Sequence, residues 1–167
     1  MNGAQLLVDG FGRVREELHA TVEGLSAEQL GYRPTPDANS IGWLVWHLTR
    51  IQDDHVADVA GTEQVWTAAG WADEFALPFD ASATGWQHTS ADVGAVRPRA
   101  QLLHGYHDAV HDRTVEFLSG VADGDFDAIV DTSWDPPVSL GARLVSVLAD
   151  DLQHIGQAAY VRGILPR

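Results

Sequence analysis

Apolar residues recur three and four positions apart in four separate parts of the chain, which is the spacing of an amphipathic helix. The pattern predicts long helices over residues 4–23, from Asn39 or Ser40 to about Ala60, from about Ser90 to about Ser119, and from Ser139 to Gly163. Pro98 would kink or restart the third helix, because proline has no backbone N–H to donate. No segment has a convincing strand pattern. We therefore predict an all-α four-helix bundle.

Two long connections interrupt the helical pattern. The first, residues 62–89, is rich in glycine and aromatic residues and is long for a loop without structure of its own. We expect it to form a short helix near residues 64–73 and to pack as a cover over the bundle. The second connection spans residues 120–138. Because no repeat or linker divides the chain, we predict a single domain over residues 1–167.

The chain is strongly acidic, with 24 Asp and Glu against 10 Lys and Arg and a formal net charge of -14. It has no cluster of basic residues, so we expect no binding to nucleic acids or to anionic membrane surfaces. The N-terminal segment does not have the pattern of a signal peptide, and no apolar run is long enough for a membrane span. We expect a cytoplasmic protein.

The chain contains no cysteine. Disulfides and thiolate metal sites are therefore excluded, and any metal ion must be bound by imidazole and carboxylate groups. Thiol chemistry would require a small molecule that carries the sulfur.

One candidate metal site combines residues from the second and last helices. Asp150 and His154 are four residues apart and share a helix face, while Asp151 and His154, three apart, form a competing pair. His47 lies on an apolar stripe of the second helix, where a lone histidine is more often a core residue than a ligand. If His47 and His154 meet, two imidazoles and one carboxylate leave coordination positions open, as in a catalytic metal site. The spacing permits this meeting and does not establish it.

A second group of histidines lies on the third predicted helix. His104, His107 and His111 have spacings that would also suit a pair of ligands. Asp108 and other charged residues interleave with them, so we expect surface histidines, with His107 nearer the core. The sequence assigns them no role.

Several segments of the chain resemble the motifs of the DinB/YfiT-like superfamily. They are Leu25-Ser-Ala-Glu-Gln-Leu, Tyr32-Arg-Pro, Ser40-Ile-Gly-Trp-Leu-Val-Trp-His-Leu-Thr-Arg and Asp150-Asp-Leu-Gln-His-Ile-Gly-Gln. The likeness runs from the first helix to Gly163 and is greatest to the actinobacterial branch related to mycothiol-dependent enzymes.

The resemblance implies a bundle with a long crossover between its second and third helices, and a homodimer. It also implies a divalent ion held by three histidines, one on the second helix and two on the last. His47 and His154 match two of these positions, whereas Asp150 occupies the third. A carboxylate favours harder ions than an imidazole does, so iron and manganese join zinc and nickel as candidates for the bound ion.

The function that the resemblance implies is metal-dependent transfer of a low-molecular-weight thiol, with mycothiol as cosubstrate, to a small-molecule substrate. Side chains beside the ligands would orient them, the candidates being Asp54, His55, Asp151 and Gln157. Two alternatives stay open. One is a metal-dependent hydrolase with Asp54 or Asp151 as the base, and the other is a non-enzymatic, stress-related dimer that binds a metal or ligand.

Overall fold

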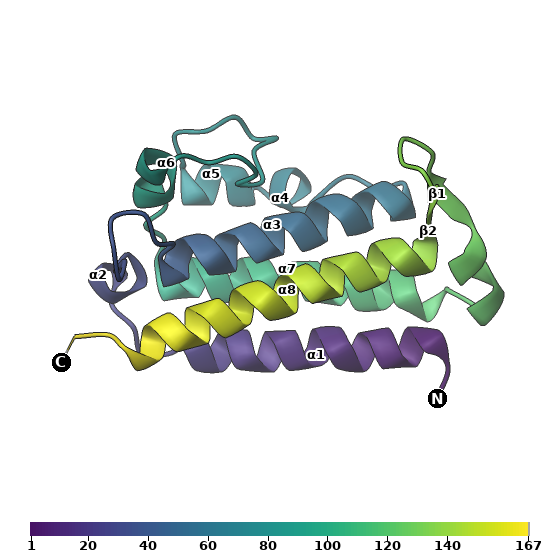
Figure 1. Ribbon diagram of the computed structural model, residues 1–167, viewed down its shortest axis with the longest axis horizontal. Coiled ribbons are helices and arrows are strands. Elements are labelled where there is room, and N and C mark those ends of the chain that lie inside the picture. Colours follow the sequence, from purple (N-terminus) through teal and green to yellow (C-terminus); the bar gives the residue numbers. More distant parts are fainter. Residues whose placement is uncertain (167) are drawn as a thin grey trace.

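A computed structural model describes residues 1–166 and consists mainly of four long helices. They are α1 (Gly3–Val22), α3 (Ile41–Ala60), α7 (Ala100–Ser119) and α8 (Leu140–Gly163). α3 packs against α7 and α8, and α1 packs against the same two helices (Figure 1). The predicted all-α bundle is confirmed.

Side-chain caps fix where these helices begin. The side chains of Asn2, Ser40 and Ser139 each accept a hydrogen bond from a backbone N–H in the first turn of α1, α3 and α8. α3 ends at Gly61, which adopts the left-handed conformation with φ 65° that favours glycine. These local signals explain why the ends predicted from the sequence for α1, α3 and α8 agree with the structure to within about two residues.

The crossover between α3 and α7 lies along the outer side of α3 (Figure 1). It contains two short helices, α4 (Val65–Ala68) and α5 (Trp71–Phe75), where one helix over residues 64–73 was expected. A third, α6 (Ser90–Ala95), precedes Pro98, so the helix predicted from Ser90 is divided into α6 and α7. The crossover is therefore a folded layer, as predicted, with more breaks than the periodicity indicates.

The expectation of no strand is wrong for the connection between α7 and α8. After a 3-10 turn, Asp123–Asp127, strands β1 (Ile129–Asp131) and β2 (Val138–Ser139) form an antiparallel pair at the end of the bundle (Figure 1). Strands of two and three residues are too short to show an alternating pattern. A further short helix, α2 (Ala27–Leu30), follows α1.

The bundle interior is apolar, with Leu18, Leu44, Leu103 and Ile155 among its buried residues. Among residues 1–166, no helix combines the length and the hydropathy that crossing a bilayer requires. Some polar side chains are also buried, and several of them belong to α3. The residues that contact these buried polar side chains define the position of the candidate site.

Candidate metal centre

His47 lies in the middle of α3 with only 6% of its surface exposed. Its Nδ1 is 2.6 Å from the carbonyl oxygen of Thr84, which belongs to the crossover. A carbonyl can only accept, so Nδ1 carries the hydrogen and donates it. The lone pair of neutral His47 is therefore on Nε2, as in histidines that bind metal through that atom.

Two neighbours hold the His47 ring in place. The Trp43 ring stacks on it with 4.6 Å between ring centroids and an interplanar angle of 16°. Gly85 approaches it so closely that an added Cβ would lie 2.7 Å from Nδ1. The φ of Gly85 is also +97°, a conformation that other residues rarely adopt. The crossover thus contributes both a hydrogen-bond acceptor and a close backbone contact to this histidine.

Burial lowers the pKa of His47, and the nearby His154 lowers it further. The hydrogen bond to Thr84 and the charge of Asp150 act in the opposite direction and are outweighed. His47 is therefore neutral at pH 7, the form that binds a metal ion.

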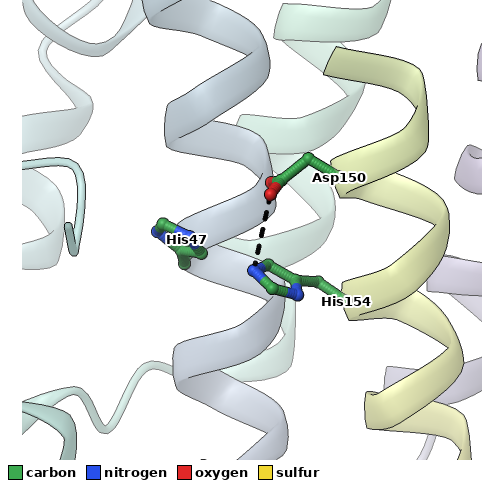
Figure 2. A group of neighbouring side chains, drawn as sticks. All are labelled: His47, Asp150 and His154. Atoms are coloured by element: carbon green, nitrogen blue, oxygen red, sulfur yellow. Dashed lines mark ion pairs between the residues drawn. The ribbon is translucent and has the colours of Figure 1, made fainter. Parts of the chain in front are cut away.

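Asp150 and His154 approach His47 from α8. Figure 2 shows both side chains on the face of α8 that is turned toward α3. His154 Nε2 lies 3.8 Å from Asp150 Oδ1, and the rings of His47 and His154 have centroids 4.9 Å apart. One donor atom from each of the three residues lies within 4.8 Å of the other two. The three residues predicted as ligands are thus brought together by the packing of α3 on α8.

These residues fit a divalent cation. Two donors that are each about 2.1 Å from one ion lie about 3–4 Å apart, so binding needs only small side-chain adjustments. Asp150 Oδ2 and His154 Nδ1 are buried and have no hydrogen-bond partner among residues 1–166. Buried polar atoms are normally paired, so unpaired ones at a cluster of donors are available to bind a ligand. The side chains of His154 and Asp150 are 20% and 35% exposed, so the cluster is accessible from solvent.

Asp151, the competing carboxylate, faces a different direction. It is fully buried on the core stripe of α8, in line with Leu144, Val147 and Ile155. Burial, with a smaller contribution from Asp150, raises its pKa well above the usual range, which favours the protonated form. Asp150 is the carboxylate that lies beside His47 and His154.

The other candidates for orienting the ligands have separate surroundings. Asp54 accepts a 2.6 Å hydrogen bond from Gln64, and His55 is half-buried, with its pKa lowered by burial and then by Arg143. Gln157 is exposed. Within residues 1–166, no hydrogen bond joins Asp54, His55, Asp151 or Gln157 to a predicted ligand. Their role as orienting residues stays a prediction.

Arg50, which was not among the residues predicted from the sequence, anchors the crossover beside His47. Its fully buried guanidinium donates through Nε to the carbonyl of Ala83 at 3.1 Å and through Nη1 to Gln64 Oε1 at 2.8 Å. It also lies 5.0 Å from the ring centroid of Trp66. Ala83 precedes Thr84, so Arg50 fixes the segment that holds His47. The sequence feature that could have revealed this role is the presence of a charged residue in the middle of an apolar helix.

Asp53 completes this anchor. Its carboxylate accepts 2.8 Å hydrogen bonds from the backbone N–H groups of Val65 and Trp66 at the start of α4, and a 2.7 Å bond from the Tyr106 hydroxyl. Arg50 lies 3.7 Å away. The crossover is thereby attached to α3 and α7 through a network in which the charged groups are paired.

His88 is a further residue that the spacing did not reveal. Its Nδ1 accepts a hydrogen bond of 3.2 Å from Trp43 Nε1, and its ring stacks on Trp46 with centroids 5.7 Å apart. Its place in an irregular segment gave no periodicity from which to infer this contact. It supports the Trp43 ring that packs on His47.

The histidines of α7 lie elsewhere. His107 is buried, in agreement with the expected position near the core. Its Nδ1 lies 3.2 Å from Thr49 Oγ1 and donates to it, because that hydroxyl already donates its hydrogen to the carbonyl of Val45. His104 and His111 are half-buried, and each has a buried ring nitrogen, so the expectation of surface histidines is wrong for them. The reason is that α1 covers this face: the His104 ring stacks on His19 of α1 at 4.4 Å. Among residues 1–166, only His47, Asp150 and His154 form a metal-like cluster.

Comparisons with known proteins agree with this picture. No match was found among curated proteins. A solved structure, described as the conserved protein of locus from Enterococcus faecalis, is similar with a TM-score of 0.90 and 29% sequence identity. The match covers 97% of this chain and 96% of that one. Residues 6–166 match the family model described as mycothiol-S-transferase (MST). The chain therefore belongs to the mycothiol-S-transferase family, within the DinB/YfiT-like superfamily that its motifs resemble.

Proposed function

We propose that the protein is a divalent-metal-dependent S-transferase that uses a low-molecular-weight thiol of the mycothiol type as cosubstrate. The observation that carries this proposal is the convergence of His47, Asp150 and His154 between α3 and α8, where Asp150 and His154 are partly exposed to solvent. Membership of the mycothiol-S-transferase family gives the reaction class.

His47, Asp150 and His154 would hold the ion and leave further coordination positions open. The bound ion would lower the pKa of a thiol, so that sulfur is present as the nucleophilic thiolate. Thr84 keeps the hydrogen of His47 on Nδ1, and Trp43 and Gly85 restrain its ring. The protein therefore needs little rearrangement before binding.

The donor set limits the candidate ions without selecting one. Two imidazoles and one carboxylate suit zinc, nickel, iron or manganese, and the carboxylate at position 150 shifts the preference toward the harder ions of this group. We expect iron or manganese to compete better with zinc here than at a site of three histidines.

The sulfur must come from the cosubstrate, because the chain has no cysteine. In the transfer, the thiol gives up its proton to solvent and the sulfur forms a bond to an electrophilic carbon of the second substrate. The leaving group departs with its bonding electron pair. We also propose that this takes place in the cytoplasm, where small thiols are kept reduced.

The test is a transfer assay on untagged protein after elemental analysis. We expect about one divalent ion per chain and mycothiol-dependent consumption of an alkyl halide such as monobromobimane. His47→Ala and Asp150→Ala should lose both metal and activity, whereas His104→Ala, which changes a half-buried histidine outside the cluster, should keep both. Thiol-independent turnover would support a metal-dependent hydrolase instead. Full retention of folding with no bound metal and no activity would support the non-enzymatic alternative.

We further propose that the protein forms a homodimer through the exposed face of α8. The exposed positions of this helix between residues 142 and 160 carry no charge. They include Val145, Leu152 and Tyr160, which are 50–69% exposed. Two copies with a net charge of -14 repel each other, so an uncharged face is the surface best suited to self-association. Val145→Glu should convert the dimer to a monomer in sedimentation experiments, and a monomeric wild type would refute this proposal.

A further inference from the structure

A cavity lies further along α3 and α8, beyond the candidate metal centre. Its volume is about 590 Å³, and its lining residues come from the end of α3, the start of α8 and the β1–β2 hairpin. These three segments lie at the same end of the bundle (Figure 1). His55 on α3 is eight residues beyond His47, and Arg143 on α8 is seven residues before Asp150. At 1.5 Å per residue, these separations place the cavity about 10–12 Å from the metal centre along the same two helices.

The lining of the cavity offers both hydrogen-bond donors and acceptors. Arg143 binds Asp131 through Nη2 at 2.6 Å, while its Nε is buried and has no partner among residues 1–166. Asp54 and Asp58 of α3 supply carboxylates. Trp134, on the hairpin, also lines the cavity and is 66% exposed. Carboxylates accept hydrogen bonds from ring hydroxyls, and an exposed indole can pack against the apolar face of a sugar ring.

The negative charge of the cavity restricts which ligands it can bind. Asp54, Asp58 and Asp131 outnumber the single guanidinium of Arg143. His55 does not restore the balance, because burial, followed by the effect of Arg143, lowers its pKa and favours its neutral form. A ligand that ends in a carboxylate would be repelled, whereas an uncharged polyol would not.

We propose that this cavity binds the uncharged, polyhydroxylated end of the thiol cosubstrate while the sulfur reaches the metal centre. The inference rests on the proposed transferase function. A cysteinyl unit joined by an amide to a glucosaminyl-inositol has a thiol at one end and two hydroxylated rings at the other, so it can extend from one site to the other. The cavity thereby selects mycothiol-like thiols over glutathione, which ends in carboxylates.

The kinetic test compares a thiol that carries the rings with one that lacks them. Trp134→Ala and Asp58→Asn change exposed residues, so the fold and the metal content should be retained. We expect each to raise KM for mycothiol about tenfold, while kcat/KM for N-acetylcysteine changes less than twofold. Asp112→Asn, an exposed carboxylate on α7, is the matched control and should change neither value. Equal effects on both thiols, or no effect on mycothiol, would overturn the inference.

A binding test separates this inference from the transferase proposal. Isothermal titration with N-acetylglucosaminyl-inositol, which has no sulfur, should show binding to the wild type that Trp134→Ala abolishes. Binding that persists in Trp134→Ala, or no binding to the wild type, would refute the cavity. Specific binding without any thiol transfer would instead refute the transferase reaction and leave the cavity established.

Discussion

α3 presents buried polar side chains to two different neighbours, and the two regions differ in how these groups are paired. Toward the crossover and α7, Arg50 and Asp53 are satisfied by backbone groups, Gln64 and Tyr106. Toward α8, the Asp150 and His154 side chains that face His47 retain buried atoms without partners. An unpaired buried polar group costs about 1–3 kcal/mol. The comparison shows that the charged groups of Arg50 and Asp53 are paired as folded, whereas Asp150 and His154 keep donor atoms that are free to bind a ligand.

The largest expected effect is the loss of stability when the paired network of Arg50 and Asp53 is disrupted. Arg50→Met should lower the free energy of unfolding by about 3–5 kcal/mol, because Asp53 would be left buried without its charged partner. Urea denaturation measures this loss. Arg113→Met removes an exposed pair with Glu116 and should cost less than about 1 kcal/mol. Similar values for the two variants would show that the network is not a structural anchor.

The next effect is the stabilisation that a metal ion should give by binding at His47, Asp150 and His154. Metal at about 100 times its Kd should raise the free energy of unfolding of the wild type by about 2.7 kcal/mol. In Asp150→Ala this gain should disappear, while the stability without metal changes little because no hydrogen bond of Asp150 is lost. Denaturation with and without chelator gives both values. Metal stabilisation that persists in Asp150→Ala would place the ion elsewhere.

A smaller effect should follow from the contact that joins the two regions. Gly85→Ala forces a strained φ and places a Cβ against His47 Nδ1, so the ring must shift. We expect metal affinity to fall about tenfold, equivalent to about 1.4 kcal/mol. Gly12→Ala, whose added Cβ meets no atom within 4 Å, is the control for titration with zinc. Equal affinities would mean that the crossover does not position the ligand.

The smallest effect is on the pH dependence of the free energy of unfolding. It tests whether His107, a buried imidazole outside both regions, has only a structural role. Burial lowers the pKa of His107 to about 3 from 6.5, with a smaller contribution from His111. The folded state therefore favours the neutral ring, and this stability is complete above pH 6.5 and is lost as pH falls toward 3. Between pH 6.5 and 5.5, the wild type should lose about 1 kcal/mol more than His107→Leu. Parallel pH profiles in urea denaturation would contradict this.

Much of the fold could be predicted because its causes are local. The helix-spaced apolar residues, Gly61 and the capping serines lie within a few positions of the features they produce. The β1–β2 pair and the half-buried state of His104 could not be predicted, since one depends on very short strands and the other on coverage by α1.

The sequence by itself determined the four long helices, the acidic composition and the lack of thiol ligands. Its motifs also gave His47, His154 and a neighbouring carboxylate as candidate ligands. Only the tertiary structure decided that Asp150 rather than Asp151 lies beside His47. It also decided that Thr84 sets the hydrogen on that ring and that Arg50 holds Thr84's segment in place. The physical reason is that helix periodicity fixes which residues share a face, whereas the rotation of α8 against α3 and the path of the crossover depend on packing between distant segments.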